Sequence, residues 1–594
     1  MPKDRNGGGV FRAVLAGIFN ALFMVLAFPP FSFWGFAFLI PLPLFALARS
    51  NRLSPSRAAF WGSLGTLPGW IWTHYWVSEI SAAGVIPLVI NLAFYSFLFI
   101  WIASHLVRRF GRDAIVLPVV WVGIEFFRGS IAWTGYPWYF IAHPLIDSPL
   151  GILATPASLG GVYLVSYLCA SYSVVLLLSV SSPTHNGRKR AGYIAATMFA
   201  LWIGIGYLLI SPDAENPQRL RVGVIQPNVP QDNRMDWTVR QRVRDWLTLR
   251  DLTIAAARDP KNPEPVDVLI WPEGFVPGWT LDPVSLATER AEHIAWTLTP
   301  RSDDDVPELK GLPSKIEATT IVDELLILQQ ALDIPMVVGS VAFDNLRIVD
   351  TDLGIEYQQD AMYNSAFVLF DGQPQPVWYD KLHLTPFGEV MPYISRWPWL
   401  EKQMLGFGAK GMKFVLSPGN EPRVLTIPIQ RASFASKTVS LATPICFEAT
   451  IPSVCRKLVF QLGQRRAGVI VNMTNDGWFG SSDAGRETHL LTARWRCIEL
   501  NTPMIRCANT GISSAIDLHG SILTRTIVPF NESDSREGHL IADVELGQGS
   551  TLYARIGDLF GWVIFASMGL LILGMIFRRS EAVEPPENPQ SRVE

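Results

Sequence analysis

Several patterns that would place the chain in a familiar class of proteins are missing from its sequence. The nine histidines show no ligand spacing such as His-Glu-x-x-His, so no metal site is predicted and no cofactor is expected. No strongly basic or phosphate-cradling stretch is present, which argues against nucleic acid and nucleotides as partners. We find no internal repeat, and the net charge of −3 favours no class of partner.

Hydrophobic residues, in contrast, are abundant and unevenly distributed. They make up 49% of the 594 residues, and the mean hydropathy of +0.23 is too apolar for an ordinary soluble protein of this length. Long apolar runs fill residues 1–211 and return at 558–579, whereas 215–555 has the composition of a soluble domain. We therefore expect seven transmembrane helices, a globular domain, an eighth helix and a disordered cytoplasmic tail at 580–594, which is rich in Glu and Pro.

The charges of the loops indicate how these helices are oriented. The expected spans lie near 10–28, 31–48, 58–77, 84–106, 114–131, 158–181, 192–210 and 560–577. Lys and Arg precede the first span and follow every even-numbered one, as Arg188, Lys189 and Arg190 do after the sixth. Because basic loops stay in the cytoplasm, we expect both termini there and the globular domain outside, at the periplasmic face of a bacterial inner membrane. A miscounted span would place that domain inside instead.

One ionisable pair lies near the outer end of the fifth span. Glu125 is either a buried functional carboxylate or half of an interfacial pair with Arg128, one turn away, and the second interpretation is favoured because span ends are wet. The aromatic loop from Trp133 to Trp138 follows, and its composition is typical of a membrane interface.

The globular domain alternates short apolar runs with helical stretches. Runs bounded by turn residues predict strands at 219–225, 266–271, 336–341, 366–370, 438–442 and 468–472. Helical patterns lie at 239–258, 322–332 and 487–500. This alternation predicts an α/β layered domain. The segment 282–320 has mixed charge and little periodicity, and it is expected to be an insertion or a lid.

The five cysteines differ in their surroundings. Cys169 lies in the sixth span and is most simply a packing residue, whereas Cys446, Cys455, Cys497 and Cys507 would face an oxidising compartment, where disulfide pairing is possible. Cys446 follows a strand-like run directly, and a nucleophile at the end of a strand is exposed at the edge of a sheet on a rigid backbone. The local pattern alone leaves both interpretations open.

Two further strand ends carry charged residues. Glu273 follows an apolar strand, where a carboxylate is usually a solvated turn residue, and Lys381 adjoins Asp380, where a lysine is usually half of a weak surface ion pair. Together with Cys446 they form a coherent set for acyl transfer. A cation favours the thiolate and can stabilise an oxyanion, while a carboxylate can accept the thiol proton.

The motifs around these residues resemble the Glu/Lys/Cys signature of the nitrilase superfamily. They are Trp-Pro-Glu273, Tyr-Asp-Lys381-x-His-Leu-x-Pro-Phe-Gly-Glu389, Pro-Ile-Cys446-Phe-Glu448, Asn472-Met-Thr-Asn-Asp-Gly-Trp-Phe-Gly480 and Arg494-Trp-Arg496-Cys-Ile-Glu499. Such a domain between the seventh and eighth spans is similar to one family in particular, the apolipoprotein N-acyltransferases of bacteria. The similarity covers nearly the whole chain, including the Gly-Tyr-Pro-Trp138 loop.

The resemblance implies a four-layered αββα outer domain and a two-step reaction. Cys446 would take an acyl chain from a membrane glycerophospholipid as a thioester, and the amine of a diacylglyceryl-modified cysteine at the N-terminus of an apolipoprotein would then receive it. The roles that the resemblance implies are Glu273 as general base, Lys381 as oxyanion stabiliser, Cys446 as nucleophile, Glu389 and Glu448 as supporting carboxylates, and Trp237 and Asn364 as substrate-binding residues.

Two features depart from the family pattern. The 282–320 segment aligns with no family motif, and Phe447 stands where an aromatic residue with a hydroxyl would also fit. Two other functions remain as alternatives. A membrane-tethered amidase could use the same three residues to hydrolyse a C–N substrate, although a reaction on a soluble substrate does not need seven preceding spans. A transporter or scaffold with an inactive outer domain is disfavoured by the intact Glu, Lys and Cys set.

Overall fold

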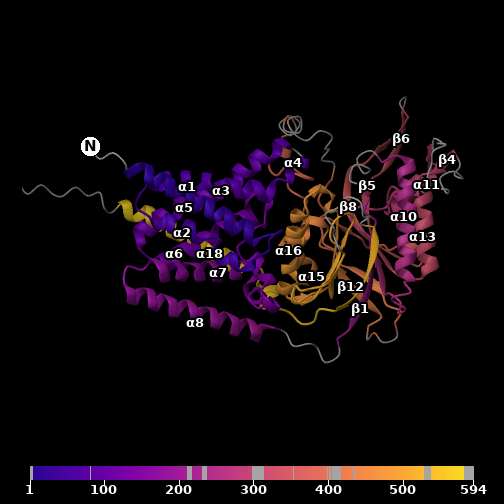
Figure 1. Cartoon of the computed structure of the whole chain (residues 1–594). Helices are drawn as coiled ribbons and strands as arrows, with labels where there is room; N and C mark the ends of the chain where they lie inside the picture. Colours follow the sequence, from indigo (N-terminus) through magenta and orange to yellow (C-terminus); the bar gives the residue numbers. More distant parts are fainter. Residues whose placement is uncertain are drawn as a thin grey trace, which may run out of the picture.

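The fold is that of a computed structural model. It describes residues 5–580 except 81, 211–216, 230–236, 298–313, 352–353, 398, 400–402, 404–415, 432–433, 435 and 527–536. A bundle of long helices and an α/β domain lie end to end (Figure 1). The start of α1 and the end of α18 both lie at the end of the bundle that is farther from the α/β domain. The side of the membrane on which the two termini lie stays a prediction.

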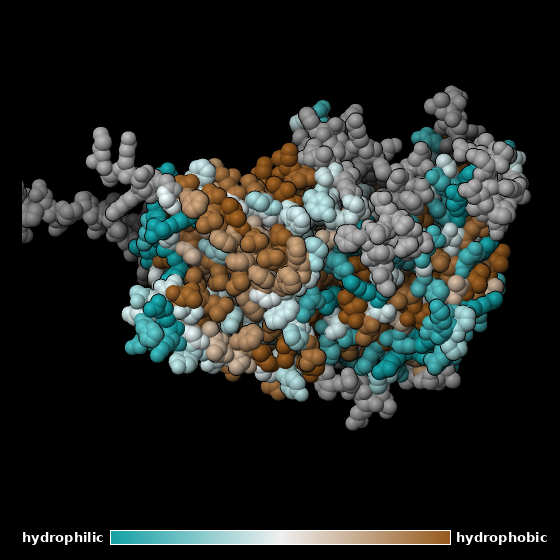
Figure 2. Space-filling model, viewed as in Figure 1, coloured by the Kyte–Doolittle hydropathy of each residue, from teal (hydrophilic) through white to brown (hydrophobic). Residues whose placement is uncertain are grey.

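Long apolar helices build the bundle. They are α1 (Arg5–Ala27), α3 (Pro55–His74), α5 (Ala82–Phe110), α6 (Asp113–Phe126), α7 (Ala157–Ser181), α8 (His185–Leu209) and α18 (Leu559–Ser580). Among the described residues, six helices are long and apolar enough to cross a membrane: Gly8–Ala27, Gly84–Phe110, Asp113–Thr134, Ala157–Ser181, His185–Leu209 and Leu559–Phe577. Figure 2 shows apolar residues over the bundle and hydrophilic residues at its far end and over the α/β domain. The chain is a multi-pass membrane protein.

Two of the expected spans differ from the structure. The stretch 31–48 does not form one helix, because it divides into a 3-10 helix, Trp34–Phe38, and a short helix α2, Leu42–Arg49. Pro41 lies at the division and has no N–H to donate to a preceding helical turn, whereas Pro43 falls in the first turn of α2, where proline is tolerated. Helix α8 begins at His185, so the basic run 188–190 lies in its first turns and not in a loop. The count of eight spans stays a prediction.

Glu125 and Arg128 do not lie in the wet environment that is expected at the end of a span. Both side chains are buried. Glu125 accepts hydrogen bonds from the backbone N–H of Ile141 and from the indole of Trp121, and Arg128 donates to the carbonyl of Tyr139. The two residues therefore hold the segment directly after the aromatic loop, at Tyr139 and Ile141, against the bundle, a role that their spacing of three residues does not indicate.

Two mixed sheets form the centre of the α/β domain. The first has the order β10-β8-β5-β2-β1-β19, with β9 paired to β8, and the second has the order β11-β12-β15-β16-β17-β18. The strands of the first are β1 (Arg219–Gln226), β2 (Val268–Ile270), β5 (Met336–Asp344), β8 (Ala361–Phe370), β9 (Gln373–Pro374), β10 (Tyr379–Asp380) and β19 (Gly538–Glu545). Those of the second are β11 (Leu425–Pro428), β12 (Thr438–Ala442), β15 (Val469–Thr474), β16 (Met504–Ala508), β17 (Ser514–Ile516) and β18 (Ile522–Arg525).

The sheets pack face to face, with helices on both outer sides (Figure 1). Cys507 of β16 contacts the carbonyls of Ile225 and Ile270 in the first sheet. Helices α10 (Val239–Ala257) and α13 (Thr320–Leu332) cover the first sheet, and α15 (Pro452–Val459) and α16 (Asp483–Leu500) cover the second. The predicted αββα layering is confirmed, as are all six expected strands and three expected helices, with shifts of a few residues at their ends.

Part of the 282–320 segment has regular structure. It contains α11 (Pro283–Ala291) and a hairpin of β3 (Ala295–Thr297) and β4 (Lys315–Glu317), while 298–313 lies outside the described residues. A second hairpin pairs β6 (Arg347–Thr351) with β7 (Gly354–Gln358), and a third pairs β13 (Phe460–Gln461) with β14 (Gln464–Arg465). The expected disordered tail lies outside the described residues, apart from the end of α18.

Candidate active site

Cys446 lies just beyond the end of β12, at the start of the 3-10 helix η7 (Cys446–Thr450). Its φ angle is +53°, a left-handed conformation that costs a non-glycine residue energy and is often found at catalytic positions. The neighbouring strand β15 holds it in place, because the amide of Asn472 donates to the Cys446 carbonyl at 3.2 Å. The hydroxyl of Thr474 lies 3.3 Å from the Cys446 Sγ. The thiol is therefore presented on a strained, well-supported turn.

Glu273 follows β2 and is buried, so it is not the solvated turn residue that its local sequence allows. Its Oε1 accepts a hydrogen bond of 2.7 Å from the amide of Asn364, and its Oε2 accepts one of 3.0 Å from the backbone N–H of Asn475. Since Asn475 follows Thr474 directly, consecutive residues at the end of β15 contact the Glu273 carboxylate and the Cys446 thiol. This places the Glu273 carboxylate and the Cys446 thiol side by side.

Lys381 follows β10, and its side chain is 1% exposed. Its Nζ lies 2.7 Å from the nearer oxygen of Glu389 and 3.5 Å from Oε1 of Glu273. Burial works against the charged form, but the carboxylates of Glu389 and Glu273 outweigh it and raise the pKa of Lys381 well above its usual value. The charged form of the Lys381 amine is therefore favoured. The surface ion pair with Asp380 that the local sequence allows is not formed, because Asp380 accepts from Ser365 instead.

Glu448 joins the loops that carry the lysine and the cysteine. Its Oε1 accepts from the backbone N–H groups of Leu382 and His383, and its Oε2 accepts from the N–H of Ile445 at 2.7 Å. The hydroxyl of Tyr379 donates to both oxygens. One buried carboxylate therefore fixes the residue after Lys381 and the residue before Cys446.

Replacing Glu448 by alanine is expected to destabilise the protein by about 2–3 kcal/mol, since it leaves one buried and two partly buried backbone donors unpaired, and a buried donor costs about 1–3 kcal/mol in that state. Thermal unfolding in detergent measures this as a lower Tm. Glu421→Ala, which removes an exposed carboxylate paired with Arg423, is the control and should leave the Tm unchanged. Equal Tm values for Glu448→Ala and the wild type would contradict the bridging role of this residue.

The Cys446 thiol is protonated at neutral pH. Burial and the Glu273 carboxylate raise the pKa of Cys446 to about 12, and the Lys381 ammonium opposes them only in part. A thiol of this kind is a poor nucleophile until a base removes its proton. The neighbouring Glu273 carboxylate is available for that step.

This protonation state predicts the pH dependence of alkylation at Cys446. Between pH 7 and 10 the rate with iodoacetamide should rise about tenfold per pH unit without a plateau, because the thiolate is the reacting species. Glu273→Gln removes a negative charge, so it should speed alkylation, whereas Lys381→Met should slow it. Mass spectrometry of the Cys446 peptide gives the rates. A plateau near neutral pH would show a resting thiolate and refute this description.

A buried cluster under β15 was not predicted from the sequence. Arg506 donates to Asn472 at 2.6 Å and to both oxygens of Asp476, and His489 Nδ1 lies 3.0 Å from Asp476. Burial alone would raise the pKa of Asp476, but Arg506 and His489 reverse this effect and hold it below its usual range. The Asn472-Met-Thr-Asn-Asp motif was the available signal, although its spacing does not indicate which side chain supports which.

The two residues expected to bind substrate have other contacts. Asn364 donates to Glu273, as described, and so orients the carboxylate. Trp237 packs against the guanidinium of Arg242, 4.9 Å from its ring centroid, and its indole donates to Asp245 at 2.6 Å. Arg242 in turn donates to the carbonyls of Pro277 and Gly278, in the loop that follows Glu273. Both residues therefore support the Glu273 loop, and substrate binding by them stays a prediction.

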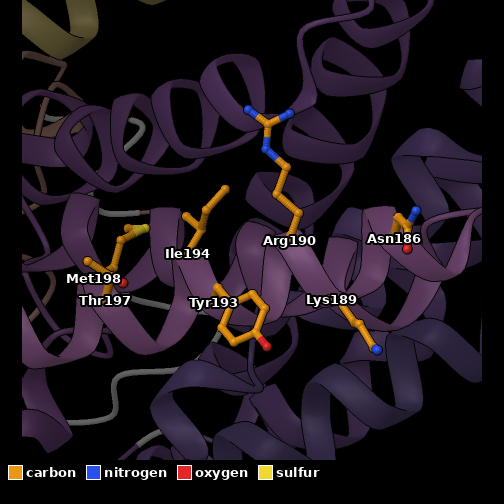
Figure 3. Close-up of a pocket in the computed structure, with 7 residues that line it drawn as sticks. All are labelled: Asn186, Lys189, Arg190, Tyr193, Ile194, Thr197 and Met198. Atoms are coloured by element: carbon orange, nitrogen blue, oxygen red, sulfur yellow. The ribbon is translucent and has the colours of Figure 1, made fainter.

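The cysteines, the metal-binding side chains and a pocket elsewhere in the described residues were also compared with the site around Cys446. All five cysteines are unpaired, so no disulfide constrains Cys446. Within the described ranges, no group of three or more metal-binding side chains occurs. A cavity of about 550 Å³ lies on α8, lined by residues from Asn186 to Met198 that include Lys189 and Arg190 (Figure 3). None of its lining residues belongs to the site around Cys446.

Comparisons with known proteins agree with this division of the chain. Residues 20–175 match the sequence model of the apolipoprotein N-acyltransferase N-terminal domain, and residues 221–552 match that of the carbon-nitrogen hydrolase family. Apolipoprotein N-acyltransferases of Geobacter metallireducens and Rhodopseudomonas palustris are 27% and 28% identical to the chain. The alignments cover 96% of both chains for the first and 95% of both for the second. An amidase of the nitrilase superfamily from Nesterenkonia is 14% identical, with a TM-score of 0.31, over 59% of this chain and 98% of its own.

The carbon-nitrogen hydrolase match covers more than half of the chain, and the N-terminal match covers most of the helix bundle. The chain therefore belongs to the carbon-nitrogen hydrolase family and, within it, to the apolipoprotein N-acyltransferases. Its class of activity is acyl transfer.

Proposed function

We propose that the protein moves an acyl chain from a membrane glycerophospholipid to the N-terminal amine of the diacylglyceryl-cysteine of an apolipoprotein, through a thioester on Cys446. The observation that carries the proposal is the buried set of Glu273, Lys381 and Cys446 in a domain that sits directly on a bundle of membrane helices. The loop charges support a bacterial inner membrane location, with this domain on the periplasmic side and both termini in the cytoplasm.

In the first step, Cys446 Sγ attacks the carbonyl carbon of a phospholipid ester while Glu273 accepts the thiol proton. The negative charge that develops on the carbonyl oxygen is stabilised by the Lys381 ammonium, whose charge Glu389 secures. The intermediate collapses, the C–O bond breaks, and Glu273 returns the proton to the departing alkoxide. A lysophospholipid leaves, and the acyl chain remains on Cys446 as a thioester.

In the second step, the neutral amine of the acceptor attacks the thioester carbonyl. Glu273 accepts a proton from the amine nitrogen, Lys381 again stabilises the oxyanion, and the C–S bond breaks. The proton passes to the Cys446 sulfur, so the thiol is regenerated and the acceptor carries an amide. In both steps Glu273 supplies the base, Lys381 the oxyanion stabiliser and Cys446 the nucleophile.

The test asks whether the acyl chain passes to the amine of a lipopeptide or to water. Purified protein receives phospholipid labelled in its acyl chains, with or without a diacylglyceryl lipopeptide, and mass spectrometry follows the label. We expect labelled N-acyl lipopeptide, with little free fatty acid when the lipopeptide is absent. Rapid release of fatty acid without transfer to the amine would overturn the proposal and favour a hydrolase. Acetylation of the lipopeptide amine beforehand is the control and should abolish transfer.

A further inference from the structure

Helix α16 forms the contact layer between the active site and the helix bundle (Figure 1). Nearly all of its side chains are buried. The indole of Trp495 donates to the carbonyl of His143, and Arg494 forms an ion pair of 2.6 Å with Asp147, so α16 faces the segment that precedes α7. The position of the active site relative to the bundle therefore depends on α16.

The membrane helix α7 is interrupted where α16 meets it. Gly160 and Gly161 have non-helical backbone angles, and Gly161 has a φ of +71°. A Cβ atom at Gly161 would lie 2.7 Å from the ring of Tyr553, so the close approach requires glycine there. Helix resumes at Val162, whose N–H donates to Oε1 of Glu499 at 2.9 Å. A carboxylate of the α/β domain thus caps a membrane helix at its positive end.

The same carboxylate is linked to the nucleophile through Arg496. Arg496 Nε lies 2.7 Å from Glu499 Oε2, and Arg496 Nη1 donates to the carbonyl of Thr450 at 2.9 Å. Thr450 is the last residue of the 3-10 helix that begins at Cys446. Three consecutive contacts therefore connect the break in α7 with the turn that carries the thiol.

Stability alone does not explain this ion pair. Both side chains are at most 1% exposed, and the loss of hydration that accompanies such burial offsets most of the attraction between the charges. Apolar residues of similar volume often stabilise a protein as well or better. The geometry that the pair imposes explains it better. Glu499 accepts from the N–H of Val162 in α7 while Arg496 donates to the carbonyl of Thr450 in η7, so the pair fixes these two segments relative to each other.

We propose that Arg496 and Glu499 are positioning residues that fix the Cys446 turn against α7, so that the thiol meets the ester of a lipid that remains in the bilayer. This inference rests on the proposed phospholipid donor. A soluble ester can diffuse to the thiol and adjust its own position, whereas a bilayer lipid is held at a fixed depth. Loss of the link should therefore impair the reaction with the lipid selectively.

The test measures two reactions of one variant, Arg496→Met combined with Glu499→Leu, which removes both charges of the pair. The first is thioester formation from phospholipid in proteoliposomes. The second is the burst with p-nitrophenyl butyrate, in which Cys446 takes the butyryl group, the ester C–O bond breaks and nitrophenolate leaves. The burst amplitude counts folded sites. We expect the lipid rate to fall about 100-fold, as displacements near 1 Å can cause, and the burst rate to stay close to that of the wild type.

A matched control is Arg525→Met, which breaks a partly exposed ion pair with Glu487 of α16 without touching the Cys446 turn, and both of its rates should match the wild type. An unchanged lipid rate in the double variant, or an equal fall in both rates, would overturn the inference. If the double variant does not fold, Arg496→Lys carries the same prediction with a smaller loss, because lysine has one nitrogen for two partners. A wild type that reacts with butyrate ester but never with phospholipid would refute the proposed function itself.

Discussion

Cys446→Ala is expected to abolish both thioester formation and acyl transfer. In the proposed mechanism the thiol holds the acyl chain between the two substrates, so its removal leaves no second route. A loss on the order of 10⁶-fold in kcat is expected when a covalent nucleophile is removed. Phospholipid turnover, measured as lysophospholipid release, gives the rate.

Folding should survive this substitution. The thiol is small, and the side chains of Asn472 and Glu448 hold the turn by hydrogen bonds to its backbone, which alanine leaves intact. Cys169→Ala, in helix α7, is the matched control and should keep near wild-type activity. Substantial turnover by Cys446→Ala would exclude a covalent mechanism at this residue.

Glu273→Gln is expected to lower kcat by about 10²–10⁴, the range for loss of a general base. Glutamine keeps the size of the side chain and an oxygen for the N–H of Asn475, but it cannot accept the thiol proton. The burial of Cys446 makes the base necessary, since its thiol stays protonated at neutral pH.

The combination of two measurements makes this prediction specific. Glu273→Gln should turn over substrate more slowly and yet react faster with iodoacetamide, because removing a negative charge lowers the pKa of Cys446 while removing the proton acceptor. A merely structural role for Glu273 would move both rates in the same direction. Asn364→Ala, which removes a donor to this carboxylate, should show a milder loss of turnover.

The sequence predicts those features of the fold that depend on local patterns. Apolar runs such as Val268–Ile270 end at turn residues, and strands buried on both faces form where these runs occur. Glu273, Lys381 and Cys446 each follow a strand within a motif of a few residues, so their positions at one edge of the two sheets could be inferred. The αββα layering came from the family resemblance and agrees with the structure.

Contacts between distant segments could not be predicted in this way. Glu499 caps an N–H 337 residues away, at Val162, and no periodicity links the two. Asn475 reaches Glu273 across 202 residues, although both stand in recognised motifs. Pro41, at which 31–48 divides, was visible in the sequence, but mean hydropathy over a window conceals its effect. Long-range pairing of polar groups depends on the folded geometry, which local composition does not encode.

The most direct test of the central claim is the intact mass of the protein after incubation with phospholipid alone. A covalent acyl adduct should form, map to Cys446 by peptide analysis, disappear in hydroxylamine, and persist until a diacylglyceryl lipopeptide with a free amine is added. Cys446→Ala should carry no adduct under the same conditions. Acyl transfer to the lipopeptide by wild-type protein that never acquires an adduct at Cys446 would contradict the thioester mechanism.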